Sequence, residues 1–489
     1  MGTRSLRRYA SSMKTQERRS AVRDRAADDR AALDRVVDDI IDFRASVSDL
    51  PVAPDVKPDD IRAELARFDF SEPVALGELV EDVARLLRRW SLHVTHPRYF
   101  GLFNPSTRVA GVAADALVAA YNPQLAAWPH SPIGNEIERH ALAWLMSTFG
   151  LDPRTGFANF TSGGQEANQT AVTAALTAAF PEYGEGGSRA LAGDPVMYVS
   201  DEAHHSFVKI AHQSGLGRTA VRNIAVDRHL RMNVEALSQA IGDDKATGRL
   251  PFLIVATAGT TAAGAIDPLR DVAAVAHRAG VWLHVDAAWG GAAILSPALR
   301  HHLDGIELAD SITCDAHKWL SAPVGAGMFF SRSREPILQA FRVEASSYVP
   351  PAVPDTFDPY VTTIQWSRRF IGLKVFMTLA ELGAQGIAAQ VEHQAEVADL
   401  LRERLMAAGW GVVNDSPLAI VCFTHPDIER GAITLQSVLD RVIDSGRAWI
   451  SEVTLSDGRH ALRACVTSYR TQPEDVAILV DELERALEG

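Results

Sequence analysis

Lys318 is the residue whose type and surroundings point most directly to chemistry. It lies between His317 and Trp319, directly after the apolar run 311–314. A lysine at the end of a buried run is poorly placed for a surface charge, and a neutral lysine amine can attack a carbonyl carbon, which arginine cannot do. The five other lysines lie in helical, polar or terminal stretches: Lys14, Lys57, Lys209, Lys245 and Lys374. Lys318 is therefore predicted to form an imine with a carbonyl compound, the alternative being a lysine whose ammonium reaches solvent from a strand end.

Asp286 is the second candidate, because it ends the apolar run 281–285. A carboxylate at the end of a buried strand is costly unless it is paired. The protonated pyridine nitrogen of pyridoxal 5'-phosphate (PLP) is a suitable partner, and PLP also carries the aldehyde that Lys318 needs. The alternative is an aspartate that caps a helix or accepts ordinary hydrogen bonds.

Two further motifs suit the same cofactor. Gly163 and Gly164 open an alanine-rich helix, and a glycine turn at a helix N-terminus favours a phosphate, although such a turn is often only a turn. His204 follows a predicted strand and is expected either to lie flat on an aromatic cofactor or to cap the next helix. A metal site with His205 is disfavoured, since adjacent side chains diverge and no third ligand is evident, and no metal is expected.

Short apolar runs place these residues in a sheet. The runs 196–200, 252–256, 281–285 and 311–314 alternate with helical stretches such as 269–279. This pattern is typical of an α/β fold with a mostly parallel sheet and helices on both faces. Because such sheets bind ligands at the carboxyl ends of their strands, the candidate residues are expected to meet there.

The flanking segments predict helices and a smaller domain. Residues 26–50 and 60–92 have helical spacing around a proline-bearing stretch, and their apolar faces need either the main body or a second subunit. A helix is predicted over 365–382. The tail, with apolar runs 418–423 and 461–466 and a helix over 474–487, predicts a small α+β domain. The predicted division is a helical, dimer-forming segment 1–108, a large cofactor-binding domain 109–373 and a small domain 374–489.

Composition narrows the class of protein. The 48 basic and 61 acidic residues give a net charge of −13, which is the wrong sign for a nucleic-acid partner. The basic N-terminus is expected to be a solvated, partly disordered arm without a function. Three distant cysteines with no CxxC pair indicate a reducing compartment. With neither an export signal nor an apolar span in evidence, a soluble, cytoplasmic protein without a membrane partner is expected.

In their order along the chain, these motifs resemble the group II PLP-dependent decarboxylases. That family includes the aromatic-amino-acid, glutamate, cysteine-sulfinate and 2,4-diaminobutyrate decarboxylases and has the aspartate-aminotransferase-like fold, fold type I. The resemblance runs from about residue 70 onward and includes the stretches 96–101, 128–132, 257–261 and 367–370. It implies PLP, an amino-acid substrate, α-decarboxylation to an amine and CO2, and a homodimer that shares active-site residues across its interface.

The resemblance also implies roles for individual residues. Lys318 would carry PLP as a Schiff base flanked by His317, and His204 would stack on the ring that pairs with Asp286. The remaining cofactor contacts would come from Gly163, Gly164 and Gln165 at the phosphate and from Thr261 and Ala288.

In the same family, a tyrosine on a loop after the lysine protonates the substrate carbon. Tyr348 matches that position, and Tyr360 is the reserve. Phe103 and Asn104 are expected in the substrate pocket. The alternatives are another fold type I reaction (transamination, carbon–carbon lysis or decarboxylation-coupled amine oxidation) and a catalytically silent PLP-binding scaffold. Asp315-Ala316 departs from the common Asn-Pro, and the pocket stretches lack an aromatic-rich pattern, which leaves the substrate open.

Overall fold

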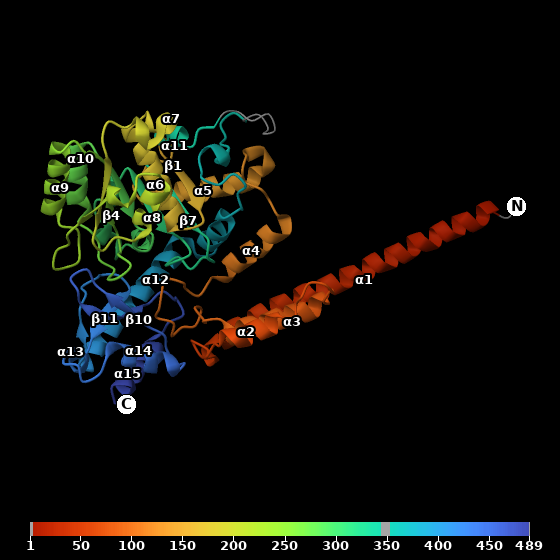
Figure 1. The fold of residues 1–489 in the computed structure, drawn as a ribbon. Coiled ribbons are helices and arrows are strands. Elements are labelled where there is room, and N and C mark those ends of the chain that lie inside the picture. Colours follow the sequence, from red (N-terminus) through yellow and green to blue (C-terminus); the bar gives the residue numbers. More distant parts are fainter. Residues whose placement is uncertain (1–2, 344–352, 489) are drawn as a thin grey trace.

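Three parts can be distinguished in the computed structural model, which describes residues 3–343 and 353–488 (Figure 1). A large lobe contains a seven-stranded sheet, a small lobe contains a four-stranded sheet, and helices of the N-terminal segment extend away from both lobes. None of the helices in these described ranges combines the length and apolar character needed to cross a membrane.

The seven-stranded sheet confirms the predicted α/β class. Its strands, in chain order, are β1 (Phe157–Thr161), β2 (Pro195–Ser200), β3 (Val221–Ile224), β4 (Leu250–Thr257), β5 (Trp282–Asp286), β6 (Ser311–Asp315) and β7 (Gly327–Ser331). Their order across the sheet is β1-β7-β6-β5-β4-β2-β3, and only β7 runs antiparallel to its neighbours. The apolar runs are continuous because most of these strands are buried on both faces.

Alternate residues of each strand pack into cores on opposite faces of this sheet. In β2, Met197 and Val199 pack on the side of α6 (Gly164–Ala179) and α8 (Ser206–Gln213). Val196 and Tyr198 belong to the core on the other face. That core is built with the helices α5 (Pro132–Thr148), α9 (Val234–Ala246), α10 (Leu269–Ala279) and α12 (Gly372–Ala407). The helix predicted over 269–279 is thereby confirmed as α10.

The N-terminal segment is helical as predicted but is divided differently. It contains α1 (Thr3–Ser46), α2 (Pro58–Leu65) and α3 (Leu76–Trp90), and α3 packs against α1. The predicted helix over 60–92 is interrupted at 66–75, where Phe70 has a φ of 63° and Pro73 cannot donate a helical hydrogen bond. The helix α1 begins at Thr3 and projects beyond the lobes (Figure 1), so the basic N-terminal arm is described as helical.

The helix predicted over 365–382 begins later than expected. Residues 365–371 are held in non-helical contacts, among them the bond from the Leu125 N–H to the Arg368 carbonyl. The helix α12 therefore begins at Gly372, and its first part ends at Leu382 as predicted, because Gly383 has a non-helical backbone with a φ of 61° and a ψ of 174°. Glycine tolerates this conformation, and a second helical part continues from the kink to Ala407.

The small lobe confirms the predicted α+β tail. Its antiparallel sheet has the order β10-β11-β9-β8. Its elements are β8 (Gly411–Val412), β9 (Ile420–Thr424), α13 (Pro426–Glu429), α14 (Leu435–Asp444), β10 (Ser451–Thr454), β11 (His460–Cys465) and α15 (Pro473–Glu488).

Candidate active site

A cavity lies at the carboxyl ends of β4, β5 and β6, where the parallel strands were expected to bring the candidate residues together. Asn168 and Asp286, which are 118 positions apart in sequence, are joined there by a hydrogen bond. The side chains and backbone around it come from Gly164, Gln165, Asn168, His204, Thr257, Gly259, Thr261, Asp286, Ala288, Trp289, Asp315 and Lys318.

Lys318 follows β6 and directs its amine into this cavity. Its Nζ lies 3.0 Å from Oδ2 of Asp315 and 5.3 Å from the ring centroid of Phe103. Asp315 is buried, and its Oδ1 has no hydrogen-bond partner among the described residues. The neighbouring Trp319 is fully buried and stacks on Trp289, with 5.1 Å between ring centroids. This packing fixes the backbone of the lysine, so the amine occupies the cavity instead of extending freely into solvent.

Asp286 ends β5 and is held by a buried polar network. Its Oδ2 accepts from Nδ2 of Asn168 at 2.8 Å, and its Oδ1 accepts from the Ala288 N–H at 3.1 Å. Behind Asn168, Nε2 of His284 lies 3.1 Å from the Asn168 amide oxygen, and Nδ1 of His284 lies 2.9 Å from Oγ of Ser311. The network orients one carboxylate toward the cavity and leaves no positive side chain bonded to it, so a cationic partner in the cavity would complete it.

Burial lowers the pKa of His284 to about 4, with the nearby Asp286 acting in the opposite direction. The unfolded chain has an ordinary histidine pKa of 6.5 and therefore binds more protons than the folded chain between these two values. We expect the free energy of unfolding to fall between pH 7 and pH 5 by roughly 2 kcal/mol more in the native chain than in a His284→Gln variant. Urea unfolding at the two pH values measures this difference. The exposed His277 offers a control, since the His277→Gln variant should lose as much free energy of unfolding between pH 7 and pH 5 as the native chain does. If the His284→Gln variant lost that same amount, the expectation would be contradicted.

His204 lies on the loop after β2 and borders the cavity. Its Nδ1 accepts from the Ser206 N–H at 3.2 Å, at the start of α8, so the histidine makes a helix-start contact and also lines the site. Although its side chain is accessible from the cavity, partial burial lowers the pKa of His204, and Lys318 adds to this while Asp286 opposes it. A ring that is neutral and accepts at Nδ1 carries its proton on Nε2.

The N-terminus of α6 forms the far end of the cavity. The backbone N–H groups of Gly164 and Gln165 bond to no acceptor among the described residues, as expected for the first turn of a helix. A Cβ at Gly164 would approach Oδ2 of Asp315 to 3.0 Å and the Cβ of Ala288 to 3.2 Å. Gly164 therefore leaves room beside free donors, which is the arrangement that a phosphate requires.

The remaining predicted cofactor residues lie around the same space. Thr261 and Ala288 line the cavity. His317 packs beside the turn, with its Cε1 3.6 Å from where a Cβ at Gly163 would be, and its Nδ1 accepts from the Ala326 N–H. Burial lowers the pKa of His317. These positions are consistent with a ring bound between α6 and Asp286.

Arg463 lies beside the cavity, although no pattern in the sequence selected it. Its side chain is buried on β11, its Nε donates to the Thr261 and Ala262 carbonyls, and its Nη1 donates to the Gly101 carbonyl. Its Nη2 is buried and has no partner among the described residues, and its Cζ lies 5.1 Å from the Phe103 ring. Phe103 does not line the cavity itself, but the Lys318 amine lies 5.3 Å from its ring, so Phe103 and Arg463 pack next to the lysine.

Of the other predicted residues, Asn104 and Tyr360 do not line the cavity. Asn104 is half-buried and does not line it. Tyr348 lies outside the described residues. Tyr360 packs elsewhere, with its N–H donating to the Ala126 carbonyl and its ring 4.8 Å from that of Trp366.

Comparison with known proteins decides the family. The model of the pyridoxal-dependent decarboxylase conserved domain matches residues 58–425. The chain belongs to this family. It is a PLP-dependent carboxy-lyase that removes the α-carboxyl group of an amino acid, with the fold type I architecture expected from the resemblance.

The matches to individual relatives cover nearly the whole length of this chain. Aromatic-L-amino-acid decarboxylase of Bacillus atrophaeus is 29% identical and L-2,4-diaminobutyrate decarboxylase of Rhizobium meliloti (strain 1021) is 31% identical. The matches cover 93% of this chain in both cases, and 94% and 90% of the relatives. The structure of Oryza sativa TDC with PLP and tryptamine superimposes with a TM-score of 0.89 at 26% identity, covering 95% of this chain and 98% of that chain. Mouse CSAD gives a TM-score of 0.87 at 27% identity, with 94% and 98% coverage.

Proposed function

We propose that Lys318 binds PLP covalently in this cavity and that Asp286 pairs with the protonated pyridine nitrogen. The observation that carries the proposal is the geometry: Lys318, the Asp286 network and the free N–H groups of α6 border one space. A phosphate at the N-terminus of α6, bound by Gly163, Gly164 and Gln165, would be stabilised by the helix dipole. Thr261, Ala288 and His317 would complete the contacts.

The chain's own residues would then direct the bond that breaks. Bound PLP supplies a ring system that accepts the electron pair left on the substrate Cα when CO2 departs. His204 would cover one face of that ring, and the carboxyl group to be lost must stand perpendicular to the ring plane. Asp286 would keep the pyridine nitrogen protonated, and Tyr348 would deliver the proton to Cα. Lys318 would finally displace the product amine.

Release of CO2 from a panel of L-amino acids by purified, PLP-loaded protein tests this proposal. One amino acid should yield equal amounts of CO2 and of its amine. A keto acid formed without CO2 would indicate transamination, and an aldehyde with ammonia would indicate decarboxylation coupled to amine oxidation. Either product would contradict the proposed reaction.

We also propose that Arg463 binds an anionic group of the substrate, with Phe103 packing against the substrate's carbon skeleton. The buried, unpartnered Nη2 supports this, because a guanidinium donor without an acceptor is costly until an anion arrives. Asn104, which follows Phe103, stays a proposed pocket residue on the resemblance alone. The relatives act on both aromatic and non-aromatic amino acids by their names, so the substrate is not chosen from them.

Replacing Arg463 by glutamine is expected to raise KM at least about tenfold while changing kcat less, because the lost contact binds the substrate before reaction. Steady-state kinetics on the amino acid found in the panel measures the two constants. Arg459→Gln is the matched control, since Arg459 is exposed and paired with Asp457 on the same hairpin. An unchanged KM in the Arg463 variant would remove this residue from substrate binding.

A cytoplasmic homodimer is proposed as the working form. Apolar side chains of α1 and α3 are exposed in the single chain, for example Leu33 at 64% and Leu87 at 59%. A groove of about 830 Å³ between α4 (Val109–Tyr121) and α5 is also apolar, with Tyr121 and Ile133 exposed beside it. A second copy would bury both surfaces.

In this proposal residues 1–108 form the interface, 109–373 bind PLP and 374–489 close the site. No nucleic acid or membrane is needed as a partner, and the three free, buried cysteines suit a reducing compartment. Light scattering of the eluting protein tests the dimer, and an active monomer would contradict it.

A further inference from the structure

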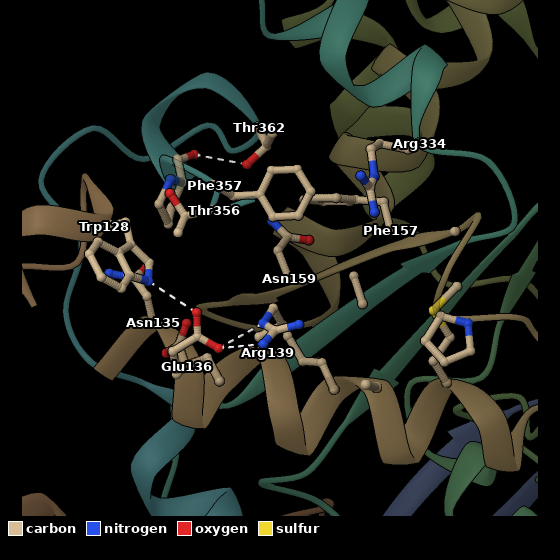
Figure 2. A pocket seen from close by; sticks show the side chains of 18 of the residues that line it. Trp128, Asn135, Glu136, Arg139, Phe157, Asn159, Arg334, Thr356, Phe357 and Thr362 are labelled. Atoms are coloured by element: carbon tan, nitrogen blue, oxygen red, sulfur yellow. Dashed lines mark hydrogen bonds and ion pairs between the residues drawn. The ribbon is translucent and has the colours of Figure 1, made fainter. Parts of the chain in front are cut away.

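A second cavity, of about 500 Å³, lies apart from the Lys318 site (Figure 2). It is enclosed by α5, by β1 and by the segment 355–363, and it shares no lining residue with the cavity around Lys318. Figure 2 shows Trp128, Glu136 and Arg139 on one side of the space and Asn159, Phe157 and Arg334 on the other. Its volume is that of a pocket for a small organic molecule.

Asn159 presents an unsatisfied amide to this cavity. The residue is only 5% exposed, yet neither its Nδ2 nor its Oδ1 has a hydrogen-bond partner among the described residues. Its strand β1 lies at the edge of the sheet and pairs with β7 along one side. A buried amide without partners is rare and costly, which points to a polar molecule that completes it.

Arg334, which is half-buried, supplies a positive charge to the lining of the same cavity. Its Cζ lies 4.5 Å from the ring centroid of Phe357, and its Nε is buried without a partner. The other three arginines of the lining are each paired with a carboxylate: Arg139 with Glu136, Arg154 with Asp152 and Arg368 with Glu138. Arg334 has no such partner in the described part of the chain, so its guanidinium can accept one more anion in this cavity.

We propose that this cavity binds a small organic carboxylate, whose oxygens accept from the Arg334 guanidinium and the Asn159 amide. A planar carboxylate matches the fork of guanidinium donors, and the apolar walls at Leu142, Met146 and Phe157 fit the carbon skeleton. Water alone would satisfy the amide but would leave the guanidinium charge uncompensated. The exposed Asp355 is the one acidic group of the lining that forms no ion pair with the described residues, and it allows an ammonium group on the same ligand.

Benzoate is the probe, titrated calorimetrically into the full-length, PLP-loaded protein. Saturable binding is expected, and Arg334→Gln should weaken it at least about tenfold, as loss of one charge-assisted pair predicts. Benzamide, which has nearly the same shape but no charge, should bind at least about tenfold more weakly than benzoate. Arg342→Gln is the matched control, because Arg342 is exposed and paired with Glu185. It should bind benzoate as the native chain does.

Two further variants keep the result specific to this cavity. Asn159→Leu keeps a similar side-chain shape but removes the amide, so it should weaken benzoate binding at least about tenfold, with thermal unfolding confirming that the variant is folded. Arg463→Gln should leave benzoate binding unchanged, which separates this cavity from the anion-binding position proposed beside Lys318 whatever the fate of the proposed mechanism. No saturation up to about 10 mM benzoate, far weaker than a built site gives, or equal binding by the Arg334 variant would overturn the proposal and leave a water-filled cavity.

Discussion

Replacing Lys318 by alanine is expected to lower kcat at least about 10³-fold, the largest loss of any single substitution in the chain. The amine is the only lysine nitrogen that lines the described cavity, and it would both anchor PLP and displace the product. The variant should also lose the visible absorbance of lysine-bound PLP while it still binds PLP noncovalently through α6 and Asp286. Steady-state kinetics and absorbance spectra of the dialysed protein measure both effects.

Lys209→Ala is the matched control for this substitution. Lys209 is exposed on α8, two turns or fewer from His204, and makes no contact with the cavity. Its loss should change neither spectrum nor kcat. If the Lys318 variant retained the lysine-bound absorbance, another amine would carry the cofactor and the proposed site would be misplaced.

The strands that carry the site could be predicted because burial on both faces leaves a simple pattern. The apolar runs at β2, β4, β5 and β6 are confirmed within a few residues. Three other strands, β1, β3 and β7, were not predicted. β1 contains Asn159, β3 contains Arg222 and Asn223, and such polar residues interrupt an apolar run even though the strands pair fully in the sheet. Pairing between distant segments therefore decided β1 and β3, whereas the apolar residues 328–330 of β7 are a local signal that could have predicted that strand.

The same distinction holds for the site. Lys318, Asp286 and His204 each stand at the end of an apolar run, so their shared edge of the sheet could be predicted. Asn168, His284 and Arg463 could not, because each acts through a partner far away in sequence. Asn168 reaches Asp286 across 118 residues, and Arg463 reaches Gly101 across 362. Such contacts exist only once the two lobes and the sheet are assembled.

The Asn168 contact bears directly on the electrostatics of Asp286. An amide donor stabilises the carboxylate without neutralising it, and His284 is held neutral by burial, which lowers its pKa. The network therefore keeps a negative charge at the end of β5 and adds no cation of its own. An ion pair with the protonated ring nitrogen of PLP would therefore stabilise the buried Asp286 carboxylate.

Asp286→Asn is accordingly expected to lower kcat about 10²- to 10³-fold, since breaking one partner of a buried ion pair costs about 3–5 kcal/mol. The amide keeps the size of the carboxylate and can still meet Asn168, but it cannot hold a proton on the ring nitrogen. PLP should still attach to Lys318, so the visible absorbance should persist with a shifted maximum while turnover falls.

Asp310→Asn separates this electrostatic effect from a loss of stability. Asp310 is a partly buried carboxylate at the opposite end of the same strands, where it accepts from the Leu283 N–H. Its substitution should lower the urea midpoint of unfolding and leave kcat of the folded enzyme near the native value. Asp286→Glu, which restores the charge, should recover part of the lost turnover. If Asp286→Asn instead kept most of kcat, the ring nitrogen would not need its proton, and the carboxylate at the end of β5 would serve only to orient Asn168 and the Ala288 backbone.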